Sequence, residues 1–209
     1  GKSSLIGRLA LACFAQVPDL RIAVLAIDPS SAESGGALLG DRVRTHFPVG
    51  ERRIYFRSQA TQGDLGGMGR RTFAVVRLLR HLFDLVLIET VGIGQSEIEV
   101  TQLADCVVLV MQPLAGDHVQ FLKAGIMEVP DVFVINKCDE EQLARRSAHE
   151  LRAALAYAKI GGPQQRPIFQ TSALTGRGID ELATVLRGTA ADRPDAETLR
   201  AHEAHFLRK

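Results

Sequence analysis

The sequence predicts an α/β fold in which a mostly parallel sheet is covered by helices on both faces. Short apolar runs alternate along the chain with longer segments in which apolar residues recur at the helical period. The clearest runs, at residues 21–28, 84–90 and 132–136, are rich in Val, Ile and Leu, as is typical of strands buried on both faces. Each run ends at a polar residue, and ligands bind at the carboxyl ends of the strands in such sheets.

Length and composition fit one domain of this kind. The chain has 209 residues, of which 46% are hydrophobic, enough to bury a substantial core. Lys and Arg number 25 against 24 for Asp and Glu, so no overall charge favours nucleic acid or an anionic membrane. No apolar run approaches the ~20 residues that span a bilayer. The three cysteines are odd in number and widely spaced, which predicts reduced thiols in a cytoplasmic protein.

The expected elements follow one another in order. A helix over residues 2–16 carries apolar residues near the helical period, and a Ser- and Gly-rich loop separates the strand at 21–28 from a short strand at 54–57. Residues 66–81 begin with glycines, become helical and lead to the strand at 84–90. The remaining expectations are strands at 106–112, 132–136 and 167–172, and helices at 140–159 and 179–186.

The first residues match the last part of a phosphate-binding loop. Gly1-Lys2-Ser3-Ser4 precedes a helix at once, as in the end of G-x-x-x-x-G-K-[ST]. Helix and loop amides cradle phosphate oxygens, Lys2 would neutralise phosphate charge, and the Ser3 hydroxyl would bind Mg²⁺. The alternative is an ordinary helix start, since the tripeptide is common. We expect the first strand and the start of this loop to lie upstream of Gly1.

A second motif predicts guanine recognition. Asn136-Lys137-Cys138-Asp139 has the form N-K-x-D at a strand end. The Asp139 carboxylate can accept two hydrogen bonds from guanine, a pair that adenine does not offer. Asn136 would stabilise the loop and the Lys137 stem would cover the base, whereas the alternative is a polar turn after a buried strand. A loop containing Ser172 and Ala173 would face the guanine oxygen.

Acidic residues at strand ends predict a metal site. Asp28 and Glu89 end buried runs, and a carboxylate there needs a partner such as Mg²⁺. With Ser3 and Asp41 they would share direct and water-mediated contacts. Alternatively Asp28 caps a turn, and Asp41 caps a helix or pairs with a nearby arginine. Gly92 would let its backbone amide approach the γ-phosphate.

Longer stretches resemble one family closely. They are residues 26–44 (AIDPSSAESGGALLGDRVR), residues 89–97 (ETVGIGQSE), and residues 114–117 leading to 123–128. They are similar to the GTPase chaperones of adenosylcobalamin-dependent acyl-CoA mutases, which include methylmalonyl-CoA mutase-associated bacterial proteins and the G domain of fused isobutyryl-CoA mutase. The resemblance covers roughly residues 1–180 and implies a P-loop fold of the signal-recognition and metallochaperone type.

The resemblance also implies residue roles. It assigns Mg²⁺ to the four residues of the predicted metal site, with Ile27 and Thr90 lining it, and places Arg44 on the nucleotide. Residues 113–123 resemble a third switch segment that senses nucleotide and contacts the mutase. Within this segment Lys123 would reach the acidic residues of the predicted metal site, unless it is a solvated helix lysine. Outside the segment, Gln95 would help orient the attacking water.

The motifs predict a cytoplasmic, Mg²⁺-dependent GTP hydrolase. The resemblance implies that it gates delivery or removal of the cobalamin cofactor of an acyl-CoA mutase. Lys2, Gln95 and Lys123 are its expected catalytic residues. Residues 1–188 would form the G domain and 189–209 a short C-terminal extension, with homodimerisation left open and no nucleic acid or membrane partner expected.

Three other functions stay open at this stage. They are a nickel-type metallochaperone GTPase, a transport-associated ATPase or kinase, and a non-catalytic docking domain of a larger mutase. The first would need Cys or His ligands close to the switch segments, and N-K-x-D argues against ATP.

Overall fold

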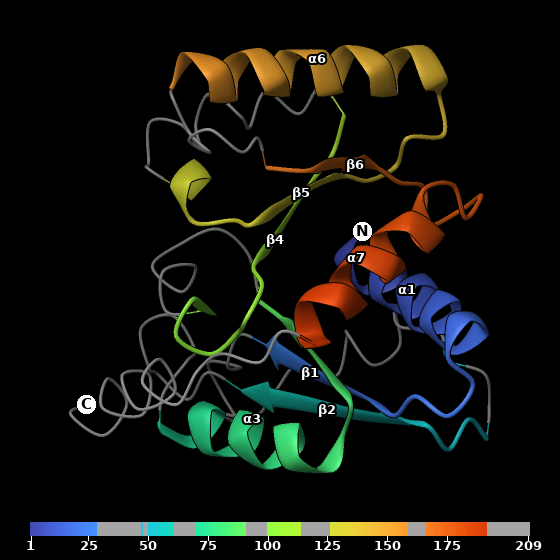
Figure 1. Ribbon diagram of the computed structural model, residues 1–209, viewed down its shortest axis with the longest axis vertical. Helices are drawn as coiled ribbons and strands as arrows, with labels where there is room; N and C mark the ends of the chain where they lie inside the picture. Colours follow the sequence, from blue (N-terminus) through green and yellow to red (C-terminus); the bar gives the residue numbers. More distant parts are fainter. Residues whose placement is uncertain are drawn as a thin grey trace, which may run out of the picture.

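The computed structural model describes residues 1–28, 47, 50–60, 70–90, 100–113, 126–158 and 166–191. Six strands in these ranges form two parallel sheets of three strands each (Figure 1). In the first sheet β1 (Ile22–Asp28) lies between β2 (Ile54–Ala60) and β3 (Leu85–Glu89). In the second sheet β5 (Val132–Ile135) lies between β4 (Val108–Met111) and β6 (Ile168–Gln170).

Four α-helices in the described ranges cover these sheets. α1 (Lys2–Gln16) and α7 (Ile179–Ala191) lie side by side (Figure 1). α3 (Arg70–Leu82) packs on the first sheet and α6 (Glu141–Tyr157) on the second. A 3₁₀ turn, η1 (Ile126–Glu128), precedes β5. None of the helices described is long and apolar enough to cross a bilayer.

Strand periodicity explains how one sheet has two covered faces. In β1, Ile22 and Val24 join the apolar cluster of α1 and α7, whereas Ala23 and Leu25 join the cluster under α3. The second sheet divides in the same way: Val132 and Val134 of β5 face α1 and α7, and Phe133 and Ile135 face α6. The α1 and α7 layer therefore covers both sheets, and α3 and α6 cover the opposite faces of one sheet each, as alternating side chains require.

The predicted α/β architecture with parallel strands and helices on both faces is confirmed. The first helix has the predicted bounds, while β2 is three residues longer than expected, reaching Ala60 instead of Arg57. β4 begins only at Val108, because the Val107 amide donates to the Asp131 carboxylate, 2.8 Å away, just before the ladder to β5 starts.

The last helix was predicted to end at Leu186 but continues to Ala191. Packing against α1 explains the extension, since Arg187 donates from Nε and Nη2 to the Gln16 side-chain oxygen, at 3.1 and 2.6 Å. The domain boundary expected at residue 188 stays a prediction, and α7 runs through that position.

Parallel pairing brings the carboxyl ends of the strands to one edge. Ala26 lies opposite Glu89, and Ile135 lies opposite Met111 and Gln170. The α1 N-terminus connects the two sheet edges, because Ser3 donates to Glu89 of the first sheet and the Gly1 carbonyl accepts from Asn136, which follows β5 of the second. The polar motifs were expected to meet at this edge.

Candidate nucleotide and metal site

The N-terminus of α1 has the properties of an anion site. Gly1 is the N-cap and provides no side-chain cap, and the first turn contains no acidic residue. The Gly1 carbonyl accepts the Leu5 amide at 3.1 Å, so the helix starts at once. The positive end of a 15-residue helix, with Lys2 in its first turn, therefore lies at the site edge.

Ser3 and Glu89 meet behind this helix end. The Ser3 hydroxyl donates to Glu89 Oε1 at 2.9 Å, and both residues are 7% exposed. Glu89 ends β3 and Ser3 lies 86 residues away in the first turn of α1, so the fold assembles the pair. Hydroxyl and carboxylate oxygens are hard donors of the type that Mg²⁺ prefers, so this pair fits a magnesium ion.

Asn136 joins three separate segments through one buried amide. It follows β5 and is 2% exposed. Its Nδ2 donates to the Gly1 carbonyl at 3.3 Å, and its Oδ1 accepts from the Thr171 hydroxyl and the Ala173 amide, also at 3.3 Å. The residue therefore fixes the α1 N-terminus relative to the loop after β6.

Lys137 adopts a backbone conformation that is unusual for a residue with a side chain. Its φ is +67°, in the left-handed region. Its ammonium group donates to the Gln112 side-chain oxygen at 2.9 Å. Gln112 directly follows β4, so this contact ties the N-K-x-D loop to the neighbouring strand end.

Asp139 is exposed, and one oxygen of its carboxylate accepts a hydrogen bond from a buried side chain. The hydroxyl of the fully buried Ser172 donates to Asp139 Oδ1 and accepts the Thr175 amide at 3.0 Å. The preceding Cys138 anchors the loop, since its amide donates to the Thr171 carbonyl at 2.9 Å. Burial raises the pKa of the Cys138 thiol, which keeps it uncharged beneath the loop.

A tight turn shapes the loop after β6. Gly178 has φ +68°, and a Cβ there would lie 2.2 Å from the Gln170 carbonyl oxygen, so only glycine fits. Arg8 of α1 also holds this loop, because its guanidinium donates to the carbonyls of Ala173 and Leu174 at 2.9 and 3.3 Å. α1 therefore contacts both the N-K-x-D loop, through Gly1, and the loop after β6, through Arg8.

Other predicted site residues make none of the contacts described above or lie outside the described ranges. Ser4 is exposed, and Thr90 is partly buried after β3. The Ile27 side chain lies in the apolar cluster under α3, so only its backbone can face the strand end. The predicted residues Asp41, Arg44, Gly92, Gln95 and Lys123 lie outside the described residues, as does the Asp28 side chain.

Sequence reasoning missed Arg8 and Gln112. Arg8 acts on residues 165 and 166 positions away, and no local pattern signals such a contact. Gln112 carried one usable signal, because it is a polar residue at the end of a predicted strand.

Known proteins resemble this chain along most of its length. A putative GTPase of Pyrococcus horikoshii is 42% identical over 188 residues, which cover 87% of this chain and 58% of that protein. The mouse mitochondrial methylmalonic aciduria type A homolog is 41% identical over 171 residues, covering 80% of this chain and 41% of the relative. The chain thus spans about half the length of these relatives.

Similar folds occur among solved structures. The crystal structure of HypB from Helicobacter pylori in complex with nickel superimposes with a TM-score of 0.62 at 16% identity, covering 92% of this chain and 82% of HypB. At this identity the likeness concerns the fold alone. The model of the family described as methylmalonyl-CoA mutase-associated GTPase MeaB matches residues 1–202. The chain therefore belongs to the family of methylmalonyl-CoA mutase-associated GTPases.

Proposed function

We propose that this chain is the nucleotide-binding part of a Mg²⁺-dependent GTPase that acts as a chaperone of an adenosylcobalamin-dependent acyl-CoA mutase. The observation that carries the nucleotide part is the amide of Asn136. This amide contacts both Gly1 and the loop after β6. It therefore holds the N-terminus of α1, which suits a phosphate group, close to the N-K-x-D loop that contains Asp139. Family membership supports the link to a mutase.

Guanine selectivity would come from Asp139. Its carboxylate can accept from guanine N1–H and from the exocyclic amine, whereas adenine leaves the carboxylate without donors. Ser172 donates to one of its oxygens, which keeps the carboxylate oriented before the base arrives. The stem of the exposed Lys137 would cover the ring.

The phosphates would lie at the N-terminus of α1. Amides of the first turn and the Lys2 ammonium would neutralise their charge as water attacks the γ-phosphate and the bond to the GDP oxygen breaks. Ser3 and Glu89 would hold Mg²⁺, together with Asp28 and Asp41. When bound, this ion supplies further neutralisation of phosphate charge.

The chaperone role would couple the nucleotide state to a mutase. Loops that contact the γ-phosphate and are released after hydrolysis are a common device for such coupling. We assign this coupling to Gly92 and to the segment 113–123. Gln95 and Lys123 would act with Lys2 in catalysis, and Arg44 would contact the nucleotide. Cobalamin would stay on the mutase, and we assign no residue of this chain to it.

Calorimetric titration of the protein tests the nucleotide part. GDP with Mg²⁺ should bind, ADP should not, and Asp139→Ala should lose GDP binding. Glu140→Ala is the matched control, because this neighbouring acid is also exposed and has no side-chain capping bond. Equal affinity for ADP and GDP would refute the guanine assignment.

A cofactor-loading assay tests the chaperone part. Apo mutase is mixed with adenosylcobalamin and this protein, and the absorbance of bound cofactor is followed with GTP, GDP or no nucleotide. Loading should depend on the nucleotide and become independent of it with Asp139→Ala. Loading that is identical under all conditions would leave a GTPase without this role.

A further inference from the structure

Two hydrogen bonds tie the N-K-x-D loop to the ends of the strands on either side of it. The loop continues β5, which lies between β4 and β6. Toward β4, the Lys137 ammonium group donates to the side-chain oxygen of Gln112 at 2.9 Å. Toward β6, the Ser172 hydroxyl donates to the Asp139 carboxylate. The two side chains that we assign to the base are therefore each held by a residue at a neighbouring strand end.

Lys137 is restricted at both ends of its side chain. At the backbone end its φ is +67°, and its neighbours Asn136 and Cys138 are only 2% and 1% exposed. At the other end the ammonium group is held by Gln112. A lysine side chain in solvent samples many rotamers, so fixing both ends confines its methylene stem to a path from the end of β5 to the end of β4.

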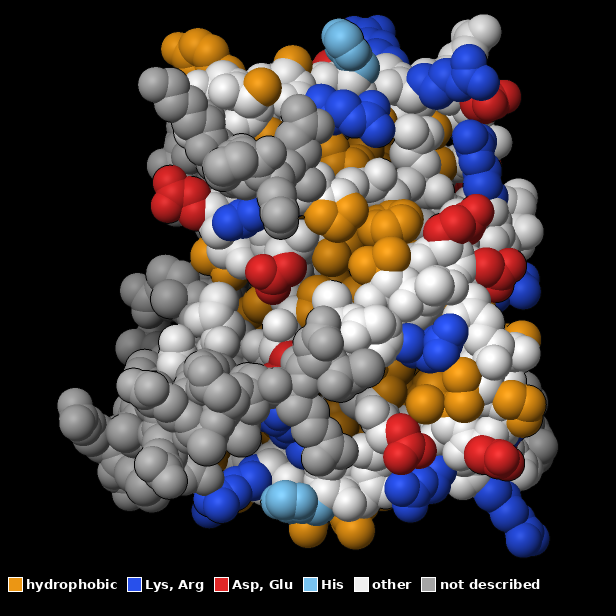
Figure 2. Space-filling model, viewed as in Figure 1, with side chains coloured by type: hydrophobic (Ala, Val, Ile, Leu, Met, Phe, Trp, Pro, Cys, Tyr) orange, Lys and Arg blue, Asp and Glu red, His pale blue; other side chains and the backbone are white. Residues whose placement is uncertain are grey.

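Long-range attraction does not account for this arrangement. The chain has 25 Lys and Arg against 24 Asp and Glu, and on the face viewed in Figure 2 the two signs are interspersed. Gln112 is uncharged, and both it and Lys137 are exposed. A hydrogen bond between exposed groups replaces bonds that both groups make to water, so it adds little to folding stability. Its main effect is therefore on the conformation of the lysine.

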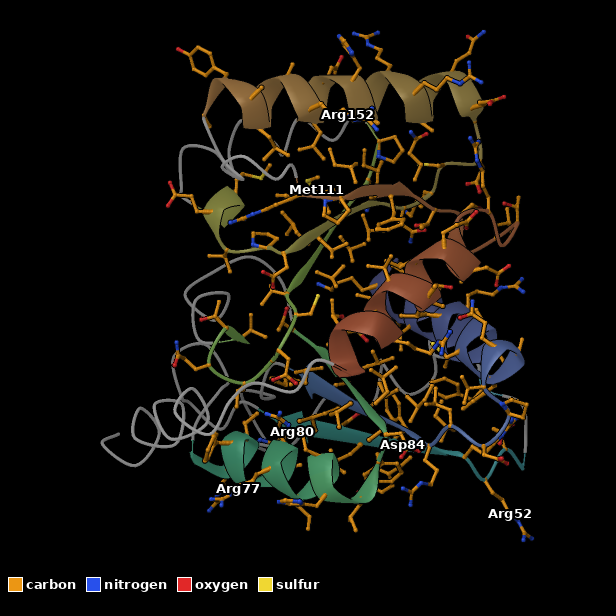
Figure 3. All side chains as sticks on the ribbon, viewed as in Figure 1. Arg52, Arg77, Arg80, Asp84, Met111 and Arg152 are labelled. Carbon is orange, nitrogen blue, oxygen red and sulfur yellow. The ribbon has the colours of Figure 1, made fainter. Side chains whose placement is uncertain are left out.

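Gln112 is itself fixed by its two neighbours. Met111, the last residue of β4, packs in the apolar cluster under α6 (Figure 3), and its carbonyl accepts the Asn136 amide at 2.9 Å. Pro113 follows Gln112, and a proline disfavours the helical conformation for the residue before it. The side-chain oxygen that holds Lys137 therefore has a rigid support.

We propose that Gln112 is a positioning residue of the base site, which acts through Lys137 by holding its stem in place before guanine binds. This role rests on the proposed function, in which Asp139 bonds the edge of the base and Lys137 covers its face. Gln112 then orients the lysine as Ser172 orients the carboxylate. Because the stem is ordered in the free protein, less conformational entropy is lost on binding, and affinity rises.

The two supporting residues should differ in their effect on base selectivity. Any purine presents a ring that a lysine stem can cover, whereas only a base with suitable donors can satisfy Asp139. Inosine diphosphate keeps the N1–H group of guanine and lacks the exocyclic amine, so it separates the two contributions. Loss of Gln112 should weaken GDP and inosine diphosphate equally, whereas loss of Ser172 should weaken GDP more.

Calorimetry of the protein with GDP and Mg²⁺ tests this role in a double-mutant cycle. Gln112→Met keeps the approximate length of the side chain and removes the amide oxygen, and Lys137→Met keeps an apolar stem and removes the ammonium group. Gln112→Met should raise the Kd for GDP about fivefold, on the scale of one hydrogen bond. In the Lys137→Met background the same substitution should change the Kd by less than about twofold, since no ammonium group remains to be held.

Two further variants separate positioning from a loss of structure. Gln112→Glu keeps an acceptor for the ammonium group, so its Kd for GDP should return to within about twofold of the parent value. Gln142→Met is the matched control, because Gln142 is an exposed glutamine in the first turn of α6, and its Kd should equal that of the parent. The ratio of the Kd values for inosine diphosphate and GDP should be the same in Gln112→Met and the parent, because only a distorted loop would displace Asp139 and change it.

An unchanged Kd for GDP in Gln112→Met would overturn the proposal, as would an undiminished effect in the Lys137→Met background or an altered ratio for inosine diphosphate and GDP. A Gln112→Glu variant as weak as Gln112→Met would also overturn it. Equal binding of ADP and GDP by the parent would refute the guanine assignment and this role with it. Selectivity for GDP that depends on Asp139 and is indifferent to Gln112 would refute the positioning role alone.

Discussion

The hydroxyl of Ser172 donates a hydrogen bond to the carboxylate of Asp139, a residue 33 positions earlier in the chain. Ser172 is fully buried, whereas Asp139 is exposed. The carboxylate assigned to guanine is therefore oriented from below by a group that solvent does not reach, which reduces the ordering cost of binding the base.

Replacing Ser172 should weaken nucleotide binding without removing it. We expect Ser172→Ala to raise the Kd for GDP about tenfold, on the scale of one hydrogen bond to a charged group. The rate of hydrolysis at saturating GTP should change little, because Ser172 contacts Asp139, which we assign to the base and not to the phosphates. Calorimetry and single-turnover kinetics measure the two effects, and an unchanged Kd would contradict the positioning role.

Ser3 and Ser4 offer a matched pair for the metal site. Ser3 is buried against Glu89, and Ser4 is exposed on the next position of α1. We expect Ser3→Ala to weaken Mg²⁺-dependent tightening of GDP binding by at least about tenfold, and Ser4→Ala to leave it nearly unchanged. Titrating Mg²⁺ at fixed GDP measures this, and equal effects of the two substitutions would argue against Ser3 as a ligand.

Alanine substitutions at Gly176 and Gly178 allow the cost of backbone strain to be told apart from the cost of a steric clash. Both have positive φ, but only at Gly178 would a Cβ meet another atom, the Gln170 carbonyl oxygen at 2.2 Å. Gly176→Ala should cost about 1 kcal/mol in the free energy of unfolding, and Gly178→Ala at least about 3 kcal/mol. Urea denaturation gives both values, and similar losses would show that the turn relaxes freely.

The Glu51–Arg53 pair should make stability depend on acid pH. Hydrogen bonds from Arg53 lower the pKa of Glu51 from 4.5 to about 2, and Arg53 also donates to the Pro18 carbonyl and lies over the Phe14 ring. A lowered pKa adds stability above the ordinary value, and this contribution disappears as pH falls from 4.5 towards about 2.

Glu51→Gln should therefore melt at a lower temperature than the parent at neutral pH, and the gap should close between pH 4.5 and about 2. Melting followed by circular dichroism at constant ionic strength measures this. Glu150→Gln breaks an exposed pair with Arg146 on α6 and should have a small effect throughout. A gap for Glu51→Gln that stayed constant with pH would assign its effect to packing.

The strands and most helices could be predicted because their signals are local. An apolar run such as residues 22–28 is visible in the sequence, and its parallel pairing follows from the alternation with helices. The end of α7 could not be predicted from residues 179–191 alone. Its last turns depend on Gln16, which lies 171 residues from Arg187.

The candidate site also has a part that could be predicted from the sequence and a part that could not. Gly1, Lys2, Ser3 and the N-K-x-D loop were visible as motifs, and their convergence follows from strand ends meeting at one edge. The supporting contacts were not visible, because Arg8 reaches the loop after β6 and Gln112 reaches Lys137 through the tertiary fold. A sequence motif names the groups that would touch a ligand, and only the folded chain shows what holds them.

The amide of Asn136 has a consequence for folding. Its partners lie 135, 35 and 37 residues away, so no local fragment of the chain can assemble it, and closing such long loops carries an entropic cost. A ligand that binds only this assembled arrangement stabilises the native state by about 4 kcal/mol at a concentration 1,000 times its Kd. A guanine nucleotide bound at the proposed site would then also favour folding, and a chain that failed to bring Gly1 and Ala173 to Asn136 would lack that stabilisation.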